Sequence, residues 1–210
     1  MNEITSIMPQ VKDKTRCNVY VDGRFCCGMT LETVVKYRLK VGQNISAERL
    51  AEIQLESERN TAFDKALTHL SATRKTERQI RTFLSGKGYL AAVIDHVIDK
   101  LRSYNFLNDE EYAENYVEFA SRKKGCRLIK MELRGKGLSE EAIEGALSGL
   151  DSESELQTAK EILQKYMRGK TVDTATMQKA CKYLIGKGFA YDIAKEALSE
   201  FGDTEDFPAD

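Results

Sequence analysis

The chain has 210 residues, of which 41% are hydrophobic and 31% are charged, and its net charge is −1. This balance is that of an ordinary water-soluble protein of one or two domains. No apolar run approaches the roughly 18 residues that a membrane span requires, and the N-terminus lacks the basic-then-apolar order of a secretory signal. We therefore expect a cytoplasmic protein with no membrane contact.

Cysteine and histidine are too sparse to suggest a metal site. The five cysteines are scattered without a C-x-x-C pair, and the only histidines are His69 and His96. Zinc sites and disulfide frameworks need closely spaced ligands or paired cysteines. We expect reduced cysteines that pack in the interior, no metal and no cofactor. With only 2 prolines to break helices, the chain is also expected to be mostly helical.

Residues 1–59 differ from the rest of the chain. The stretch "RCNVYVDGRFCCGM" holds two strand-like runs joined by an Asp-Gly pair, the strongest short signal for a β-hairpin, and "EITSIM" is a candidate third strand. A helix is expected at about 31–40, ended by Gly42, and Ser46 is a candidate N-cap for a helix beginning "AERLAEI". The pattern predicts a small α+β segment.

The remainder repeats one pattern three times. A GKG tripeptide stands at residues 86–88, 135–137 and 186–188. An apolar residue follows the second glycine of each copy, and a leucine stands four positions before that glycine. A left-handed glycine with this apolar pair is typical of a Schellman helix end. No strand and no G-x-x-x-x-G-K-[ST] spacing accompanies the glycines, so a helix end is favoured over a phosphate loop.

Each copy is expected to contain three helices. After every GKG, apolar residues recur in steps of three and four, which predicts one buried stripe per helix. Two further amphipathic stretches come before it, and Asn108 with Glu111 resembles a capping box. The second helices are expected to begin near Thr76, Gly125 and Thr176.

The predicted fold is therefore mainly α. Three tandem three-helix repeats of the helix-turn-helix kind, at residues 60–107, 108–150 and 151–201, would form an elongated array after the α+β segment. Units of about 50 residues bury their faces poorly alone and gain by stacking. Residues 202–210 carry four acids and are expected to be a disordered acidic tail.

Positive charge concentrates around the second helices of the first two repeats. The net charge is +4 over residues 60–107, but −2 over 108–150 and −4 over 151–210. Cationic clusters attract DNA phosphates or acidic protein patches, although such runs are often plain solvated faces. The candidate contacts are Arg74, Lys75, Arg78, Arg81, Arg122, Lys123, Lys124, Arg127, Lys130 and Arg134.

In repeat two, residues 127, 130 and 134 share one helix face by spacing, and repeat three keeps only Lys179 and Lys182. The spacing of Tyr112 and Tyr116 favours packing over base stacking.

The run from Phe106 to Leu147, "FLNDEEYAENYVEFASRKKGCRLIKMELRGKGLSEEAIEGAL", resembles the core signature of the RecX family, bacterial modulators of the RecA recombinase. The features that carry the likeness are an aspartate-rich cap, Tyr112-Ala113, Arg122 before Gly125, Ile129, Glu132-Leu133 and Lys136-Gly137. The outer repeats and "VDGRF" are similar to longer Gram-positive-type members, so the likeness spans about residues 3–201. Asn105 stands where many members have glycine, which could change the turn between repeats.

The resemblance implies a non-enzymatic regulator, expected to be a monomer. Such a protein binds the RecA filament on single-stranded DNA and inhibits filament growth, ATP hydrolysis and strand exchange in DNA repair, recombination and the SOS response. It also implies weak, salt-dependent binding to single- or double-stranded DNA. Filament capping, groove binding and subunit bridging are all compatible with these features.

The residues themselves give no sign of catalysis. No nucleophile–base pair, metal cluster or phosphate loop is present, and the acids at 109–111 are expected to favour the start of their own helix. The alternative function is a helical-repeat DNA-binding protein, in which the second or third helix of each repeat enters a groove.

Overall fold

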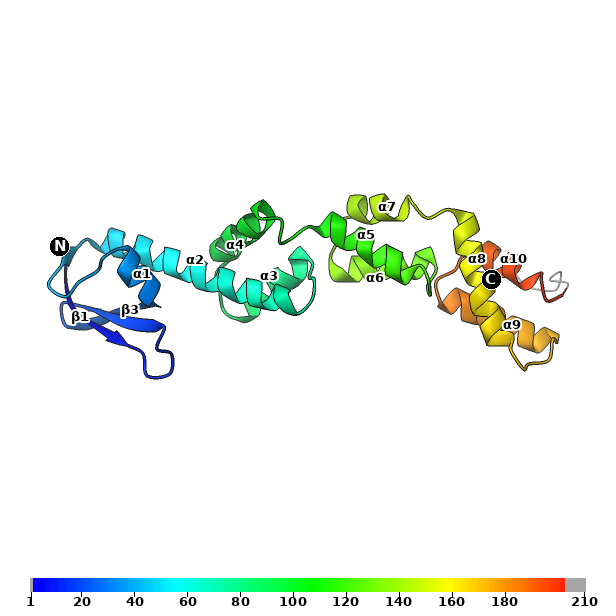
Figure 1. The fold of residues 1–210 in the computed structure, drawn as a ribbon, viewed down its shortest axis with the longest axis horizontal. Helices are drawn as coiled ribbons and strands as arrows, with labels where there is room; N and C mark the ends of the chain where they lie inside the picture. The colour runs from blue at the N-terminus through cyan, green and yellow to red at the C-terminus, as the bar shows by residue number, and fades with distance from the viewer. Residues whose placement is uncertain (1, 203–210) are drawn as a thin grey trace. The chain divides into compact units, whose positions relative to one another are not determined.

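The computed structural model describes residues 2–202, which form ten helices and four strands (Figure 1). These residues divide into two units. The first contains the chain up to Arg74 together with Ile80–Leu107, and the second contains Lys75–Gln79 together with the chain from Asn108 onward. Residues 203–210 of the expected acidic tail lie outside the described residues. The mainly α fold with a small N-terminal sheet was correctly predicted.

The first unit begins with an antiparallel sheet in the strand order β3-β2-β1-β4. Asp22 and Gly23 turn the β2–β3 hairpin with φ of 49° and 77°, the left-handed values that a two-residue hairpin of type I′ requires. The hairpin and the third strand are thus confirmed, and a short fourth strand joins them. The strands are β1 (Asn2–Pro9), β2 (Arg16–Val21), β3 (Arg24–Thr30) and β4 (Asn44–Ile45).

Helix α1 (Leu31–Lys36) is shorter than the sequence predicted. Its N-cap is Thr30, whose hydroxyl accepts the Thr33 N–H at 3.2 Å. The expected end near residue 40 was wrong, because Arg38 takes a left-handed φ of 50° and turns the chain out of the helix before Gly42 is reached.

Helix α2 (Ala47–Ala72) joins the sheet to the first three-helix domain. Its predicted N-cap is confirmed, since the Ser46 hydroxyl accepts the Arg49 N–H at 3.1 Å. The helix then runs without a break for 26 residues, so the separate helix expected at the start of the first repeat does not exist. Leu50 and Ile53 pack under the sheet, while Ala62 and Ala66 lie in the core of the three-helix domain.

Each three-helix domain has its own core, built on a fully buried alanine of its first helix: Ala62, Ala113 or Ala159. Helix α9 starts two residues before its predicted start, because the Asp173 carboxylate caps it by accepting the Thr176 N–H at 2.7 Å. After α2, the helices are α3 (Glu77–Gly86) and α4 (Ala91–Ser103), then α5 (Asp109–Ala120), α6 (Cys126–Lys136) and α7 (Glu140–Leu147), then α8 (Ser152–Met167), α9 (Thr174–Gly186) and α10 (Tyr191–Leu198) (Figure 1).

The three GKG tripeptides end α3, α6 and α9 as predicted. Gly88, Gly137 and Gly188 have φ of 86°, 87° and 92°. The N–H of the residue after each glycine donates to the carbonyl of the leucine five positions earlier, at 3.2 to 3.3 Å, and the glycine N–H donates to the carbonyl three positions earlier, at 2.8 to 2.9 Å. These are the two hydrogen bonds of a Schellman end.

Asn105 forms the same kind of end on α4. Its φ is 55°, and the Phe106 N–H donates to the Leu101 carbonyl at 2.9 Å. Asparagine tolerates the left-handed region better than most residues with a side chain. The departure from glycine noted in the sequence therefore leaves a glycine-like turn.

In the second unit, the GKG of the third domain also receives the start of α6. The Gly125 N–H donates to the Lys187 carbonyl at 3.0 Å, and the Arg127 N–H donates to the Gly188 carbonyl at 3.1 Å. A Cβ on Gly188 would lie 2.3 Å from the Cβ of Leu128. Glycine is therefore required here for close approach as well as for φ.

Residues 75–79 meet the GKG of the second domain in a similar way. The Thr76 hydroxyl donates to the Lys136 carbonyl at 2.8 Å, and a Cβ on Gly137 would lie 2.1 Å from the Cδ of Arg78. We call these two contacts joint 1 (residues 75–79 with 136–137) and joint 2 (residues 125–128 with 187–188).

A carboxylate from the following domain completes each joint. Asp109 accepts the Glu77 N–H in joint 1, and Glu155 accepts the Cys126 N–H in joint 2, both at 2.9 Å. The first N–H groups of a helix have no partner within the helix and carry partial positive charge, which a carboxylate satisfies. The acids at 109–111 lie in the first turn of α5, as expected, and Asp109 also caps the start of α3.

The steric part of joint 2 can be tested with alanine at Gly188. Gly169 is the matched control, since its φ is 76° and a Cβ there would meet nothing within 4 Å. Both variants should lose about 1–2 kcal/mol for the left-handed conformation. Gly188→Ala should lose roughly 1–3 kcal/mol more, because Leu128 must move. Equal losses in urea denaturation would contradict the close approach.

Candidate partner-binding surface

The ten basic residues predicted as partner contacts differ in whether their side chains already form ion pairs or hydrogen bonds within the protein. In repeat two, Lys130 is 2.9 Å from Glu144, and Arg134 holds both oxygens of Glu140 at 2.5 and 2.8 Å. The Arg134 hydrogen bond is the main reason that the pKa of Glu140 lies below its usual value. Two of the three residues predicted to share one basic face of α6 are thus neutralised by acids of α7.

Lys124 belongs to a packed polar network. Its amine donates to both carboxylate oxygens of Glu132 at 2.6 and 2.7 Å, and the Tyr116 hydroxyl donates to the same carboxylate at 2.6 Å. Burial raises the pKa of Glu132, but the hydrogen bonds from Lys124 and Tyr116 outweigh it, and the net shift is downward. Lys124 is therefore a structural cation as much as a surface one.

The tyrosines of the second domain pack as predicted. Tyr112 and Tyr116 are half-buried against its core, and their rings stack with centroids 6.3 Å apart. The amine of Lys136 lies over both rings, 5.2 Å from the Tyr116 centroid. A lysine over an aromatic face gains a cation–π attraction. The two rings therefore stabilise the position of the Lys136 amine.

Other predicted contacts are also engaged. Arg81 pairs with Asp95 at 2.6 Å, and Arg122 lies 3.3 Å from Glu118 and over the ring of Phe119. Arg74 and Arg78 are exposed, and Arg78 packs against Gly137 in joint 1. Among the described residues, the candidates whose side chains have no ion pair or hydrogen bond are Lys75 in joint 1, Arg127 in joint 2 and Lys123 just before joint 2.

The first unit holds a basic cleft that sequence analysis missed. Its volume is about 570 Å³, and Arg59, His96 and Lys100 contribute to its lining. Within residues 2–202, the buried Nε of Arg59 has no hydrogen-bond partner. Burial, followed by the nearby Arg59 and Lys100, lowers the pKa of His96. These residues come from α2 and α4, and no local pattern could have indicated that folding brings them together.

The same cleft contains two cations that acids already balance. Lys36 pairs with Glu56, and Arg49 pairs with Glu52 at 2.8 Å. Such exposed pairs contribute little to stability. The charge available to an anion in this cleft is therefore that of Arg59 and Lys100.

The remaining features of the described residues concern metal ligands, the hydrophobicity of the helices and the cysteines. They contain no group of three or more side chains suited to a metal ion, and none of their helices is long and apolar enough to cross a membrane. All five cysteines are unpaired. Burial, and then the Glu155 carboxylate, raises the pKa of Cys126 to about 11, which keeps this thiol in its unreactive form.

Comparisons with known proteins give one result along the chain. Models of the regulatory protein RecX N-terminal domain and of the first, second and third RecX three-helix domains match residues 2–46, 62–101, 108–147 and 153–198. The chain is 34% identical to regulatory protein RecX of Clostridium perfringens (strain SM101 / Type A) over 98% of this chain and 99% of that protein. It is 32% identical to the protein of the same name from Clostridium botulinum (strain Alaska E43 / Type E3), over 95% and 96%.

Solved structures agree. A crystal structure of regulatory protein RecX is similar with a TM-score of 0.71 and 26% identity, covering 95% of this chain and all of that chain. RecX from Lactobacillus salivarius is similar with a TM-score of 0.64 and 26% identity, covering 69% and 96%.

The network around Glu132 predicts a defined pH dependence. A carboxyl whose pKa is lowered by folding stabilises the fold above its ordinary value of 4.5, and this contribution disappears as the pH falls through the lowered pKa. Glu132→Gln should therefore cost on the order of 1 kcal/mol at pH 7, and the difference from the wild type should shrink below pH 4.5. Urea denaturation at both pH values measures this; a difference that grows with acid would contradict it.

Proposed function

Because this chain belongs to the RecX family of regulatory proteins, we propose that it binds the RecA filament on single-stranded DNA and inhibits filament growth, ATP hydrolysis and strand exchange without catalysing a reaction. The observation that carries the proposal is the match of all four RecX domain models in order along the chain. Modulation of DNA repair, recombination and the SOS response follows from the same membership.

The arrangement of free charge supports this proposal. Lys75 is the first residue of joint 1, Arg127 lies in joint 2 and Lys123 lies two residues before joint 2; none of the three side chains is paired within the described chain. Unpaired cations of this kind attract phosphates or acidic protein patches, with strength that falls as salt rises. Two similar sites can act together on a repetitive partner such as a filament, because binding at one raises the effective concentration at the other.

Direct binding to DNA is the second candidate function. It is favoured by the basic cleft of the first unit, which Arg59 and Lys100 help to line. A guanidinium that lacks a protein partner can donate to a phosphate oxygen. This candidate predicts weak binding to single- or double-stranded DNA in the absence of the recombinase.

Charge reversal beside joint 2 tests the regulator proposal. Lys123→Glu with Arg127→Glu should raise the concentration needed for half-inhibition of filament ATP hydrolysis about tenfold, or about 1.4 kcal/mol. Lys179→Glu with Lys182→Glu is the matched control, because these exposed lysines of α9 change the net charge equally. Circular dichroism checks the fold. Equal inhibition by both double variants would count against this surface.

Neutralising the basic cleft tests the second candidate. Arg59→Gln and Lys100→Gln should each weaken binding to single-stranded DNA a few-fold, and each should reduce the slope of log affinity against log salt by about 0.7. Fluorescence anisotropy at three salt concentrations measures both quantities. Unchanged slopes in both variants would show that the cleft does not contact phosphate.

A further inference from the structure

The first three-helix domain has hydrogen-bond acceptors equivalent to those that the second and third domains supply to joints 1 and 2. In joints 1 and 2, the acid that accepts a helix N–H stands four residues before the buried alanine of its domain. Glu58 stands four residues before the buried Ala62 in the first domain. The GKG of this domain supplies Lys87 and Gly88. They correspond to Lys136 and Gly137 in joint 1 and to Lys187 and Gly188 in joint 2.

No other segment of the described chain donates a hydrogen bond to these acceptors. Glu58 accepts only a 3.4 Å hydrogen bond from Gln54 of its own helix, and the carbonyls of Lys87 and Gly88 accept none from another described segment. A Cβ on Gly88 would meet nothing within 4 Å, in contrast to Gly137 and Gly188.

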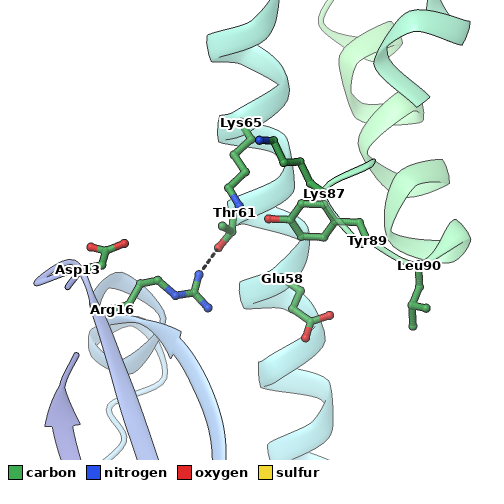
Figure 2. A pocket seen from close by; sticks show the side chains of 9 residues that line it. Asp13, Arg16, Glu58, Thr61, Lys65, Lys87, Tyr89 and Leu90 are labelled. Carbon is green, nitrogen blue, oxygen red and sulfur yellow. Dashed lines mark hydrogen bonds between the residues drawn. The ribbon is translucent and has the colours of Figure 1, made fainter. Parts of the chain in front are cut away.

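The space in front of these groups is a cleft of about 480 Å³ within the first unit. In Figure 2, the GKG loop carrying Lys87 and Tyr89 lies beside α2, from which Glu58 and Thr61 project. Beside Glu155 in joint 2, where a helix start is docked, the remaining cleft measures only about 90 Å³. The larger volume is what an unfilled joint should leave.

We propose that this cleft is an open joint that receives the first turn of an α-helix of a recombinase subunit. The inference rests on the proposed function and specifies the part of the partner that is bound. A helix start offers N–H groups without internal partners and a partial positive charge. Glu58 matches the acid that accepts a helix N–H in both filled joints, and the carbonyls of Lys87 and Gly88 match those that accept N–H groups in joint 2.

The lysine of the GKG does not prevent such docking. Lys136 and Lys187 stand in the filled joints, where their amines lie 5.2 and 5.5 Å from the ring centroids of Tyr116 and Tyr183. Lys87 lies 5.6 Å from the ring centroid of Phe83 in the same manner. The main-chain carbonyl and the side-chain cation therefore have separate partners.

Two further cations indicate what the incoming helix carries. Arg16 reaches the cleft from the sheet and donates to the Thr61 hydroxyl at 3.2 Å, and Lys65 lies 5.2 Å from the ring centroid of Tyr89 (Figure 2). Acidic residues are favoured in the first turn of a helix. An acid there would face Arg16 and Lys65 while the backbone N–H groups face Glu58.

A second copy of this chain does not fit the cleft as well. Of the three second helices, α9 is the one whose start meets no GKG loop in the described chain. Its own Asp173 already accepts the Thr176 N–H at 2.7 Å. Docking α9 would bring the Asp173 carboxylate towards Glu58, and two carboxylates repel each other.

Charge reversal at Glu58 distinguishes a helix start from a phosphate in the cleft, because the affinity should fall for the first and rise for the second. Glu58→Lys should weaken binding to recombinase filaments on single-stranded DNA about tenfold. Asp64→Lys, an exposed acid elsewhere on α2 that lines neither cleft, should leave binding unchanged. A gain in affinity in Glu58→Lys would overturn the proposal in favour of a phosphate, and equal affinity of both variants would overturn it outright. Absence of binding by the wild type would overturn the proposed function as well.

Photo-crosslinking identifies the partner segment. The photoreactive residue p-benzoylphenylalanine replaces Leu90, which lines the cleft and is 73% exposed, and replaces Val172 of the second unit as a control. We expect crosslinks from position 90, but not from 172, to the first turn of a recombinase helix with an acidic residue. Crosslinks from position 90 to DNA, to a second copy of this chain or to a helix interior would overturn the proposal.

Discussion

The fold of the second unit depends on one interaction, the hydrogen bonding of a helix start to the GKG end of another helix. Every helix begins with N–H groups that lack internal partners, and these must be satisfied wherever they are buried. Here the carbonyls of Lys187 and Gly188 and the carboxylate of Glu155 satisfy the start of α6. The second glycine of the GKG thus serves twice, as a left-handed helix end and as a point of close contact.

Joints of this kind suit domains that are small. A three-helix domain of about 40 residues buries too little apolar surface to be very stable alone, so contacts with its neighbour matter. The N-terminal sheet is handled differently, because the unbroken helix α2 supplies Ile53 to the core of the sheet and Ala66 to the core of the first domain.

Charge on this protein cannot be judged from the sequence run in which it occurs. In the sequence, Lys130 and Arg134 look like part of a cationic stripe. In the fold, Glu144 and Glu140 of α7 form ion pairs with them. Among the ten predicted contacts, all within the described part of the chain, those without an ion pair or hydrogen bond are Lys75, Lys123 and Arg127, in or beside the joints. For the proposed recognition of a filament, selective exposure matters because uniform positive charge would bind nucleic acid without discrimination.

The sequence by itself determined the features whose causes are local. The hairpin at Asp22, the Schellman ends, the Ser46 cap and the buried helical stripes each depend on residues a few positions apart, so spacing was enough to predict them. Only the tertiary structure decided which helix start meets which GKG, why Gly188 must lack a side chain, and that Arg59 and Lys100 share a cleft. Those facts depend on residues tens of positions apart, and packing alone brings them together.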